Sequence, residues 1–278
     1  MLTTTDGRPL LQADRAAIMG ILNATPDSFS DGGLFLAVEN AVDHAGQMID
    51  EGADILDIGG ESTRPGAQAV SIQQELDRVT PVIETLSSRF EIPISVDTSK
   101  PEVMQQAVVA GASMINDVRA LREEGALEAA AECGVTVCLM HMQGEPRTMQ
   151  EQPEYDDVVA DVRQFLSERV QVCTDAGISV DNLILDPGFG FGKTREQNFS
   201  LLNHLDDLKV DGLPILAGLS RKSMIGQTLG LPVDERVHAS VGLALLAVMN
   251  GANIVRVHDV KATHDALRMV EAVTLTNR

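Results

Sequence analysis

Short apolar runs alternate with longer amphipathic segments along the whole chain, and this alternation predicts its elements. The runs are rich in β-branched residues and show little polar alternation, which is typical of parallel strands buried on both faces. We predict strands at residues 17–22, Asp54–Ile58, Ile92–Val96, Ala112–Ile115, Val135–Met140, Asn182–Leu185, Pro214–Ala217 and Asn253–Val257.

The segments between these runs carry apolar residues at helical spacing. One of them opens with Ser71, a good helix cap, and places Leu76, Val79 and Ile83 on one stripe. Another opens with a proline, which a first helical turn tolerates, and stops at a glycine. The predicted helices are Val38–Glu51, Ser71–Phe90, Pro101–Ala110, Glu124–Glu132, Tyr155–Ala176, Arg195–Leu208, Val233–Met249 and Ala262–Thr274.

Eight strands that are each followed by a helix predict an α/β fold, a closed (β/α)8 TIM barrel. The length of 278 residues suits one such barrel. A doubly wound open sheet is the alternative. No linker or composition shift divides the chain, so we expect a single domain over residues 1–278. Within it, residues 1–16 are expected to form a short hairpin that caps the bottom of a barrel over 17–278.

Polar or charged residues follow every predicted strand, at the end where barrel enzymes place their active sites. A single residue of this kind is more simply explained as a helix cap. Eight polar strand ends together indicate an active face. These ends are Asn23, Asp57–Gly66, Asp97, Asn116–Asp117, His141, Asp186–Gly192, Gly218–Ser223 and Arg256–Asp259.

The overall charge narrows the class of ligand. A formal net charge of −20 argues against nucleic acids and anionic membrane surfaces as partners, because both need a basic surface. Cations at the strand ends of so acidic a chain indicate an anionic ligand, most simply a phosphate. These cations are Arg64, Arg221, Lys222, Arg256 and His258. Asn23 offers an oxygen to a Mg²⁺ ion shared with that phosphate.

A second group of strand-end residues fits a flat heterocycle. Asp97, Asn116 and Asp186 match a ring edge that is rich in N–H donors, since one carboxylate accepts two such donors at once. The two faces of such a ring would pack against Met140, Phe191 and Arg256.

Other motifs lead to no site. Gly192-Lys193-Thr194 looks like the end of a P-loop, but Pro187 stands where that pattern requires glycine, so we reject it. We interpret the glycines of this segment instead as positions where two backbones approach each other closely. Four histidines fall inside predicted helices without metal spacing, and structural or surface roles are expected for them. They are His44, His204, His238 and His264.

The cysteines and the N-terminus indicate a cytoplasmic protein. Cys133, Cys138 and Cys173 form no CxxC pair and fit buried, reduced thiols. The first residues lack the basic and apolar regions of a signal peptide. The longest apolar run, Val241–Met249, is too short to cross a bilayer.

Taken in order, the motifs of this chain resemble those of the dihydropteroate synthase family. Individually the later ones are modest, but the series runs from the first strand to the last without a departure at a motif position. The matching segments are Ile21–Gly33, Asp57–Gly66, Asp186–Thr194, Ser220–Ser223 and Arg256–Asp259.

The resemblance implies a homodimeric TIM barrel and a folate-pathway reaction that sulfonamides inhibit. The reaction condenses (7,8-dihydropterin-6-yl)methyl diphosphate with 4-aminobenzoate, using Mg²⁺, and gives 7,8-dihydropteroate and diphosphate. By analogy with the family, the helices predicted at Val233–Met249 and Ala262–Thr274 are candidates for the dimer interface.

The resemblance also implies roles for individual residues. For pterin binding they are Asp97, Asn116, Met140, Asp186, Phe191, Gly218, Lys222 and Arg256. For aminobenzoate binding they are Phe29, Thr63, Pro65, Ser220 and Lys222. For diphosphate binding they are Asn23, Arg64, Arg256 and His258, and Asn23 is also the metal ligand. The catalytic role falls to Asp97, Lys222, Arg256, His258 and Asp31, with mobile loops at residues 24–36 and 61–72.

Two alternatives share the barrel. A pterin-binding methyltransferase domain would use the same Asp and Asn contacts, but it has little need for Phe29, Thr63–Pro65 or the anion site of Arg256 and His258. A non-catalytic pterin-binding paralogue usually has damaged loops, whereas both signature loops read intact. We therefore expect the synthase.

Overall fold

The computed structural model of the chain describes residues 2–4, 7–11, 15–24, 33–62, 69–144, 149 and 153–275, and for 33–36 and 274–275 the backbone alone. Its strands are β1 (Ala17–Asn23), β2 (Ile55–Gly59), β3 (Ile94–Asp97), β4 (Met114–Asp117), β5 (Thr136–Met140), β6 (Leu183–Asp186), β7 (Leu216–Ala217) and β8 (Ile254–Val257).

These strands form one parallel sheet in the order β6-β5-β4-β3-β2-β1-β8-β7. A parallel bridge between Leu185 of β6 and Ile215, beside β7, joins the two edges of the sheet. The sheet therefore closes, and the predicted (β/α)8 TIM barrel is confirmed.

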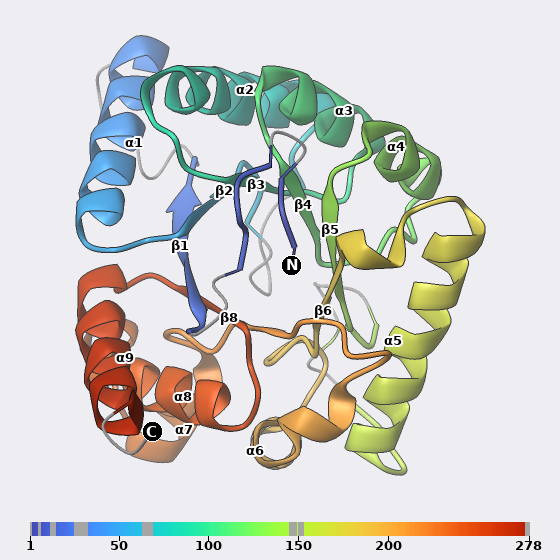
Figure 1. Cartoon of the computed structure of the whole chain (residues 1–278), viewed down its shortest axis with the longest axis vertical. Helices are drawn as coiled ribbons and strands as arrows, with labels where there is room; N and C mark the ends of the chain where they lie inside the picture. The colour runs from blue at the N-terminus through green and yellow to red at the C-terminus, as the bar shows by residue number, and fades with distance from the viewer. Residues whose placement is uncertain are drawn as a thin grey trace.

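Helices surround the strands as an outer ring (Figure 1). They are α1 (Gly33–Asp50), α2 (Ile72–Arg89), α3 (Pro101–Ala110), α4 (Ala126–Cys133), α5 (Val158–Asp175), α6 (Arg195–Asn203), α7 (Ser223–Leu229), α8 (Val237–Met249) and α9 (Val260–Leu275). No helix within the described residues has the length and apolar character needed to cross a membrane.

Three predicted helices were wrong in extent. The helix predicted at 38–51 begins earlier, at Gly33, within the loop expected at 24–36. The predicted helix 195–208 ends at Asn203, because His204 leaves the α conformation and a 3-10 turn, Leu205–Leu208, follows. The predicted helix 233–249 begins only at Val237, after a 3-10 turn at Val233–Glu235. The pattern also missed α7, which has seven residues and is too short to show a clear apolar period.

Apolar side chains fill the bottom of the barrel. Met19, Met114 and Ile184, from three different strands, belong to one buried cluster there, and Leu2 and Leu10 belong to the same cluster. An antiparallel bridge joins residues 3 and 9, so the N-terminal segment lies folded back across this end (Figure 1). The polar strand ends consequently gather at the opposite, carboxyl end of the strands.

Candidate active site

A buried ion cluster around Arg256 lies at the carboxyl ends of four strands. Its Nε donates to Asp57 Oδ2 at 2.6 Å, and its Nη2 donates to Asp97 Oδ2 at 2.7 Å. Asn116 Nδ2 donates to the same Asp57 oxygen at 3.1 Å. Asp57 is fully buried, and its other oxygen, Oδ1, has no hydrogen-bond partner among the described residues. The structure thus brings Asp97, Asn116 and Arg256 together, as predicted.

One carboxyl group of this cluster, that of Asp97, has a pKa near neutral pH. Burial raises the pKa of Asp97 to about 7, against the opposing effect of Arg256 and with a further contribution from Asp57. The carboxylate and carboxylic acid forms of Asp97 are therefore close in free energy near neutral pH. A ligand that offers N–H donors would favour the carboxylate form.

The β6–α6 loop carries a second group of predicted residues. Asp186 is buried at the end of β6, where its Oδ1 accepts a hydrogen bond from the Gly188 N–H at 2.7 Å. Burial raises the pKa of this carboxyl group, and Lys222 opposes the increase. Lys222 Nζ donates to the Phe189 carbonyl oxygen and lies 4.8 Å from the centre of the Phe191 ring. Burial lowers the pKa of Lys222 to about 8.

Two further predicted residues border these groups. Met140 pairs in register with Asp186, and Phe191 packs against the small apolar cluster that contains Met140. A Cβ atom on Gly218 would lie 3.8 Å from Lys222 Nζ and 3.9 Å from Arg256 Cβ. Gly218 therefore lies between the two cations and leaves the space beside them open.

Hydrogen bonds of Ser220 and Arg221 fix the turn that follows β7. Ser220 Oγ lies 3.0 Å from His258 Nδ1 and accepts a hydrogen bond from the His258 N–H at 3.2 Å. Arg221 has a left-handed backbone, with φ of 57°, and its Nε donates to Asp259 Oδ2 at 3.0 Å. Its N–H donates to Ser240 Oγ of α8 at 2.9 Å. The strained turn is thus fixed from α8 and from the end of β8.

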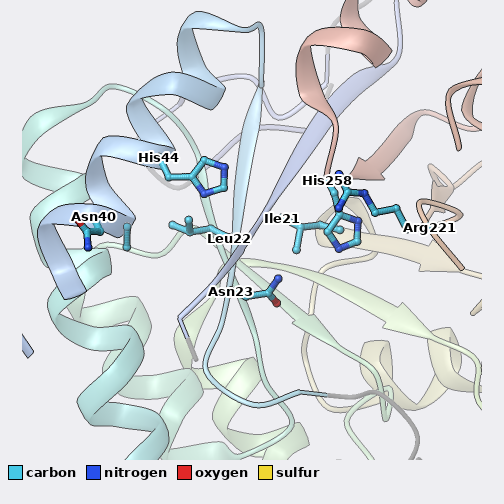
Figure 2. A pocket seen from close by; sticks show the side chains of 8 residues that line it. Ile21, Leu22, Asn23, Asn40, His44, Arg221 and His258 are labelled. Carbon is cyan, nitrogen blue, oxygen red and sulfur yellow. The ribbon is translucent and has the colours of Figure 1, made fainter. Parts of the chain in front are cut away.

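A cavity of about 270 Å³ opens beside the end of β1 (Figure 2). Asn40 and His44 project from α1 on one side, Arg221 and His258 lie on the other, and Asn23 lies between them. Ile21, Leu22 and Ala41 complete the lining. Asn23, Arg221 and His258 were predicted site residues, whereas His44 was expected to have only a structural or surface role. Arg256 was also expected beside Asn23, but among the described residues it does not line this cavity.

Five predicted residues lie outside the described residues. They are Phe29, Asp31, Thr63, Arg64 and Pro65, from the two signature loops. The sequence reasoning also missed two buried charges, Asp57 and Lys193. A signal for Asp57 was available, because a carboxylate inside the apolar run of a parallel strand needs a partner when it is buried.

Comparison with known proteins agrees with this geometry. The sequence profile described as pterin binding enzyme matches residues 19–258. The chain is 57% identical over 255 residues to dihydropteroate synthase of Escherichia coli strain K12. The aligned part covers 92% of this chain and 90% of the relative.

Two solved structures are similar over nearly their whole length. Dihydropteroate synthase of Yersinia pestis, solved as a sulfonamide drug complex, has a TM-score of 0.90 and 54% identity, covering 95% of this chain and 96% of that one. Dihydropteroate synthase of Xanthomonas albilineans, solved with 4-aminobenzoic acid, has a TM-score of 0.88 and 55% identity, covering 94% of each chain. The chain therefore belongs to the pterin-binding enzyme family and, within it, to the dihydropteroate synthases.

Proposed function

We propose that the strand-end residues divide the dihydropteroate synthase reaction into three tasks. The reaction condenses (7,8-dihydropterin-6-yl)methyl diphosphate with 4-aminobenzoate. The tasks are to bind the pterin ring, to hold the leaving diphosphate and to place the aminobenzoate. The observation that carries the proposal is the buried cluster of carboxylates and cations at one end of the barrel, which supplies acceptors for a ring edge and donors for an anion.

The pterin ring is assigned to the buried acceptors. Asp97, Asn116 and Asp186 face its N–H edge, and the unpartnered Oδ1 of Asp57 supports adding this residue to the set. A buried carboxylate oxygen without a donor is costly, and a ligand N–H would relieve that cost. The ring faces are assigned to Met140, Phe191 and Arg256, with Lys222 as a donor to the ring and Gly218 leaving room.

The diphosphate is assigned to the cations near β1 and β8. His258 and Asn23 line the cavity beside β1, and Arg221 on the same lining is a further candidate. Arg256 is engaged by Asp57 and Asp97 in the present structure. The pterin donors would take over the hydrogen bonds to Asp97, so that part of the guanidinium can turn to the diphosphate. Arg64 completes the set by resemblance.

Mg²⁺ fits the donors that are present. Within the part of the chain that the structure describes, no three His, Cys, Asp or Glu side chains are grouped to hold a metal. Mg²⁺ commonly uses few protein ligands together with substrate oxygens and water, and the amide oxygen of Asn23 suits that pattern. When bound, the ion would neutralise negative charge on the diphosphate.

The aminobenzoate is assigned to Ser220 and Lys222, which adjoin the pterin residues through the turn after β7. The hydrogen bonds between Ser220 and His258 support this placement, because they fix the serine next to the anion site. Phe29, Thr63 and Pro65 are added by resemblance.

The proposed chemistry begins with loss of diphosphate. The C–O bond breaks, both electrons leave with the diphosphate, and the cation that remains is delocalised into the pterin ring. Arg256 and His258 stabilise the leaving group, and the anionic Asp97 and Asp186 stabilise the ring. The amine nitrogen then forms the C–N bond and loses a proton. Asp31 and the two signature loops are assigned to exclude water from the cation.

We also propose that the chain is a cytoplasmic homodimer. Large apolar side chains are exposed on two neighbouring helices: Leu246 and Met249 on α8, and Met269 and Val273 on α9, at 47–69%. Large apolar side chains exposed together on neighbouring helices are typical of an interface. The cytoplasm is supported by the thiols of Cys138 and Cys173, which are buried and free.

Diphosphate release by the purified chain tests the reaction. With Mg²⁺ and the dihydropterin diphosphate, release should depend on 4-aminobenzoate, and mass spectrometry should detect dihydropteroate. Tight pterin binding without turnover would instead favour a non-catalytic paralogue or a methyltransferase domain.

The pterin assignment is tested by Asp186→Ala, which should weaken pterin binding by more than the loss of one neutral hydrogen bond, because it leaves ring N–H donors unpaired. Wild-type pterin affinity by calorimetry would remove Asp186 from the site.

A further inference from the structure

Lys193 is a buried lysine that the assigned roles leave unused, and burial lowers its pKa well below the usual value. Its side chain is only 2% exposed, yet no carboxylate among the described residues lies within ion-pair distance of it. Its Nζ instead contacts His141 Nδ1 at 2.9 Å, the Gly188 carbonyl oxygen at 2.9 Å and the Phe191 carbonyl oxygen at 3.0 Å. These three acceptors match the three N–H groups of an ammonium. The lysine of the rejected P-loop motif thus points into the protein.

The contact with the Gly188 carbonyl leads to Asp186. Gly188 is held on both sides, since its carbonyl oxygen accepts from Lys193 and its N–H donates to Asp186 Oδ1 at 2.7 Å. Gly188 has a φ of 68°, and a Cβ atom there would come within 1.8 Å of the His141 carbonyl oxygen. The loop therefore packs directly on the end of β5, and Lys193 holds the residue, Gly188, whose N–H orients the Asp186 carboxylate.

The contact with the Phe191 carbonyl leads to Lys222. Lys193 holds the Phe191 carbonyl, and the ring of the same residue lies 4.8 Å from Lys222 Nζ. Lys222 also donates to the carbonyl of Phe189, which lies between the two residues that Lys193 holds. The position of one lysine near the ring site consequently depends on the loop that the other lysine supports.

Other groups support different parts of this loop. Asn198 Oδ1 accepts from the Gly190 N–H at 2.6 Å, and Tyr155 Oη donates to the Gly192 carbonyl oxygen at 2.7 Å. Neither of these bonds involves the Gly188 or Phe191 carbonyl, although the Phe191 N–H also donates to the Gly188 carbonyl at 3.1 Å within the loop. Burial lowers the pKa of His141 to about 2, with a contribution from Lys193, so its ring is neutral, and the tautomer with its proton on Nε2 makes Nδ1 an acceptor for Lys193.

We propose that Lys193 is a positioning residue for the pterin subsite. It fixes the loop of residues 187–192 and, through Gly188 and Phe191, sets the orientation of the Asp186 carboxylate and the surroundings of Lys222. It does not touch substrate. The inference rests on the proposed assignment of Asp186 and Phe191 to the pterin.

Lys193→Met is the main test, because it keeps a similar length and removes both the charge and the donors. Its KM for the dihydropterin diphosphate and its Kd for pterin by calorimetry should rise about tenfold or more. Its KM for 4-aminobenzoate should rise clearly less than its KM for the pterin substrate, because Lys222 is the aminobenzoate residue that contacts this loop, whereas the pterin loses the orientation of Asp186 as well. Lys193→Gln keeps two N–H donors and should recover part of the lost pterin affinity. Lys261→Met removes a lysine that is 62% exposed and should change neither constant.

A double-mutant cycle with Asp186→Asn separates positioning from general loss of structure. If Lys193 acts through Asp186, adding Lys193→Met to Asp186→Asn should weaken pterin binding much less than it weakens the wild type. Circular dichroism and the thermal midpoint establish that each variant is folded.

Several results would overturn the proposal. They are unchanged pterin affinity in folded Lys193→Met, equal losses for pterin and aminobenzoate, and additive effects in the cycle. Failure of both Lys193 variants to fold would assign the residue to barrel stability instead. Wild-type pterin affinity in Asp186→Asn alone would overturn the underlying pterin assignment, whereas weak binding there with normal binding in Lys193→Met would overturn only the positioning role.

Discussion

Replacing Arg256 with methionine removes the cation that Asp57 and Asp97 share among the described residues. Asp57 is fully buried and the Asp97 side chain is only 10% exposed, so water compensates poorly for the lost guanidinium. Breaking a buried pair by removing one partner costs about 3–5 kcal/mol, because the other charge stays buried without compensation. We expect a loss of about 3 kcal/mol in the free energy of unfolding at pH 7, the lower end of that range, because Asp97 can take up a proton.

The cost should depend on pH, with a definite sign. The pKa of Asp97 is about 7 in the folded protein and Arg256 holds it down, so it rises further in the variant. Between about pH 4 and about pH 7 the folded states of both proteins bind one more proton at Asp97 than the unfolded chain, whose pKa is about 3.9, and the two stabilities fall in parallel as pH rises. Above about pH 7 only the variant keeps this proton, so the difference should grow by up to about 1.4 kcal/mol per pH unit.

Urea unfolding followed by circular dichroism, at intervals from about pH 6 to about pH 9, measures this difference. The chain has no tryptophan and one tyrosine, so tryptophan fluorescence is not an option. The control is Arg268→Met, since Arg268 pairs with Glu271 and is 62% exposed. It should lose less than about 0.5 kcal/mol without a pH trend. A loss below about 1 kcal/mol for Arg256→Met at pH 7, or a difference that does not grow above it, would refute the assignment of a buried shared cation.

Three further predictions concern activity and assembly. The kcat/KM for the dihydropterin diphosphate should rise up to about pH 7 as Asp97 loses its proton and fall above about pH 8 as Lys222 loses its own, and a flat profile from steady-state rates would contradict both roles. Removing Mg²⁺ with EDTA should stop diphosphate release and adding it back should restore release; full turnover in EDTA would remove the metal from the mechanism. Leu246→Asp should shift the molar mass from dimer to monomer in light scattering, and an unchanged mass would place the interface elsewhere.

The barrel could be predicted because its physical cause is local. A parallel strand buried on both faces must be apolar along its length, so β1 to β8 show in the sequence as short apolar runs. The errors fall where a single backbone conformation decides. His204 and the turn after Pro232 end or delay a helix although the apolar pattern continues, and no count of apolar residues detects such a change.

The site could be predicted as a set of residues but not as a set of contacts. Parallel strands all end at the same rim, so polar residues that follow them must gather there. Which of them pair is decided by distances that the order of residues does not contain. Asp57 and Arg256 are 199 positions apart and form the shortest described contact in the cluster. Lys193 was set aside when Pro187 excluded the P-loop pattern, and nothing in the sequence shows which way its side chain points.

The pairing of Arg256 explains how one residue can carry two proposed roles. Without ligand, its guanidinium compensates Asp57 and Asp97, which would otherwise be uncompensated charges in a buried site. A ligand with only an N–H edge could occupy the carboxylates but would leave the guanidinium without an anion. A ligand with only a phosphate could occupy the guanidinium but would leave the carboxylates without donors. On the proposed assignment, a substrate that carries both parts compensates all three charges at once, so the ion cluster itself favours the pterin diphosphate over either half.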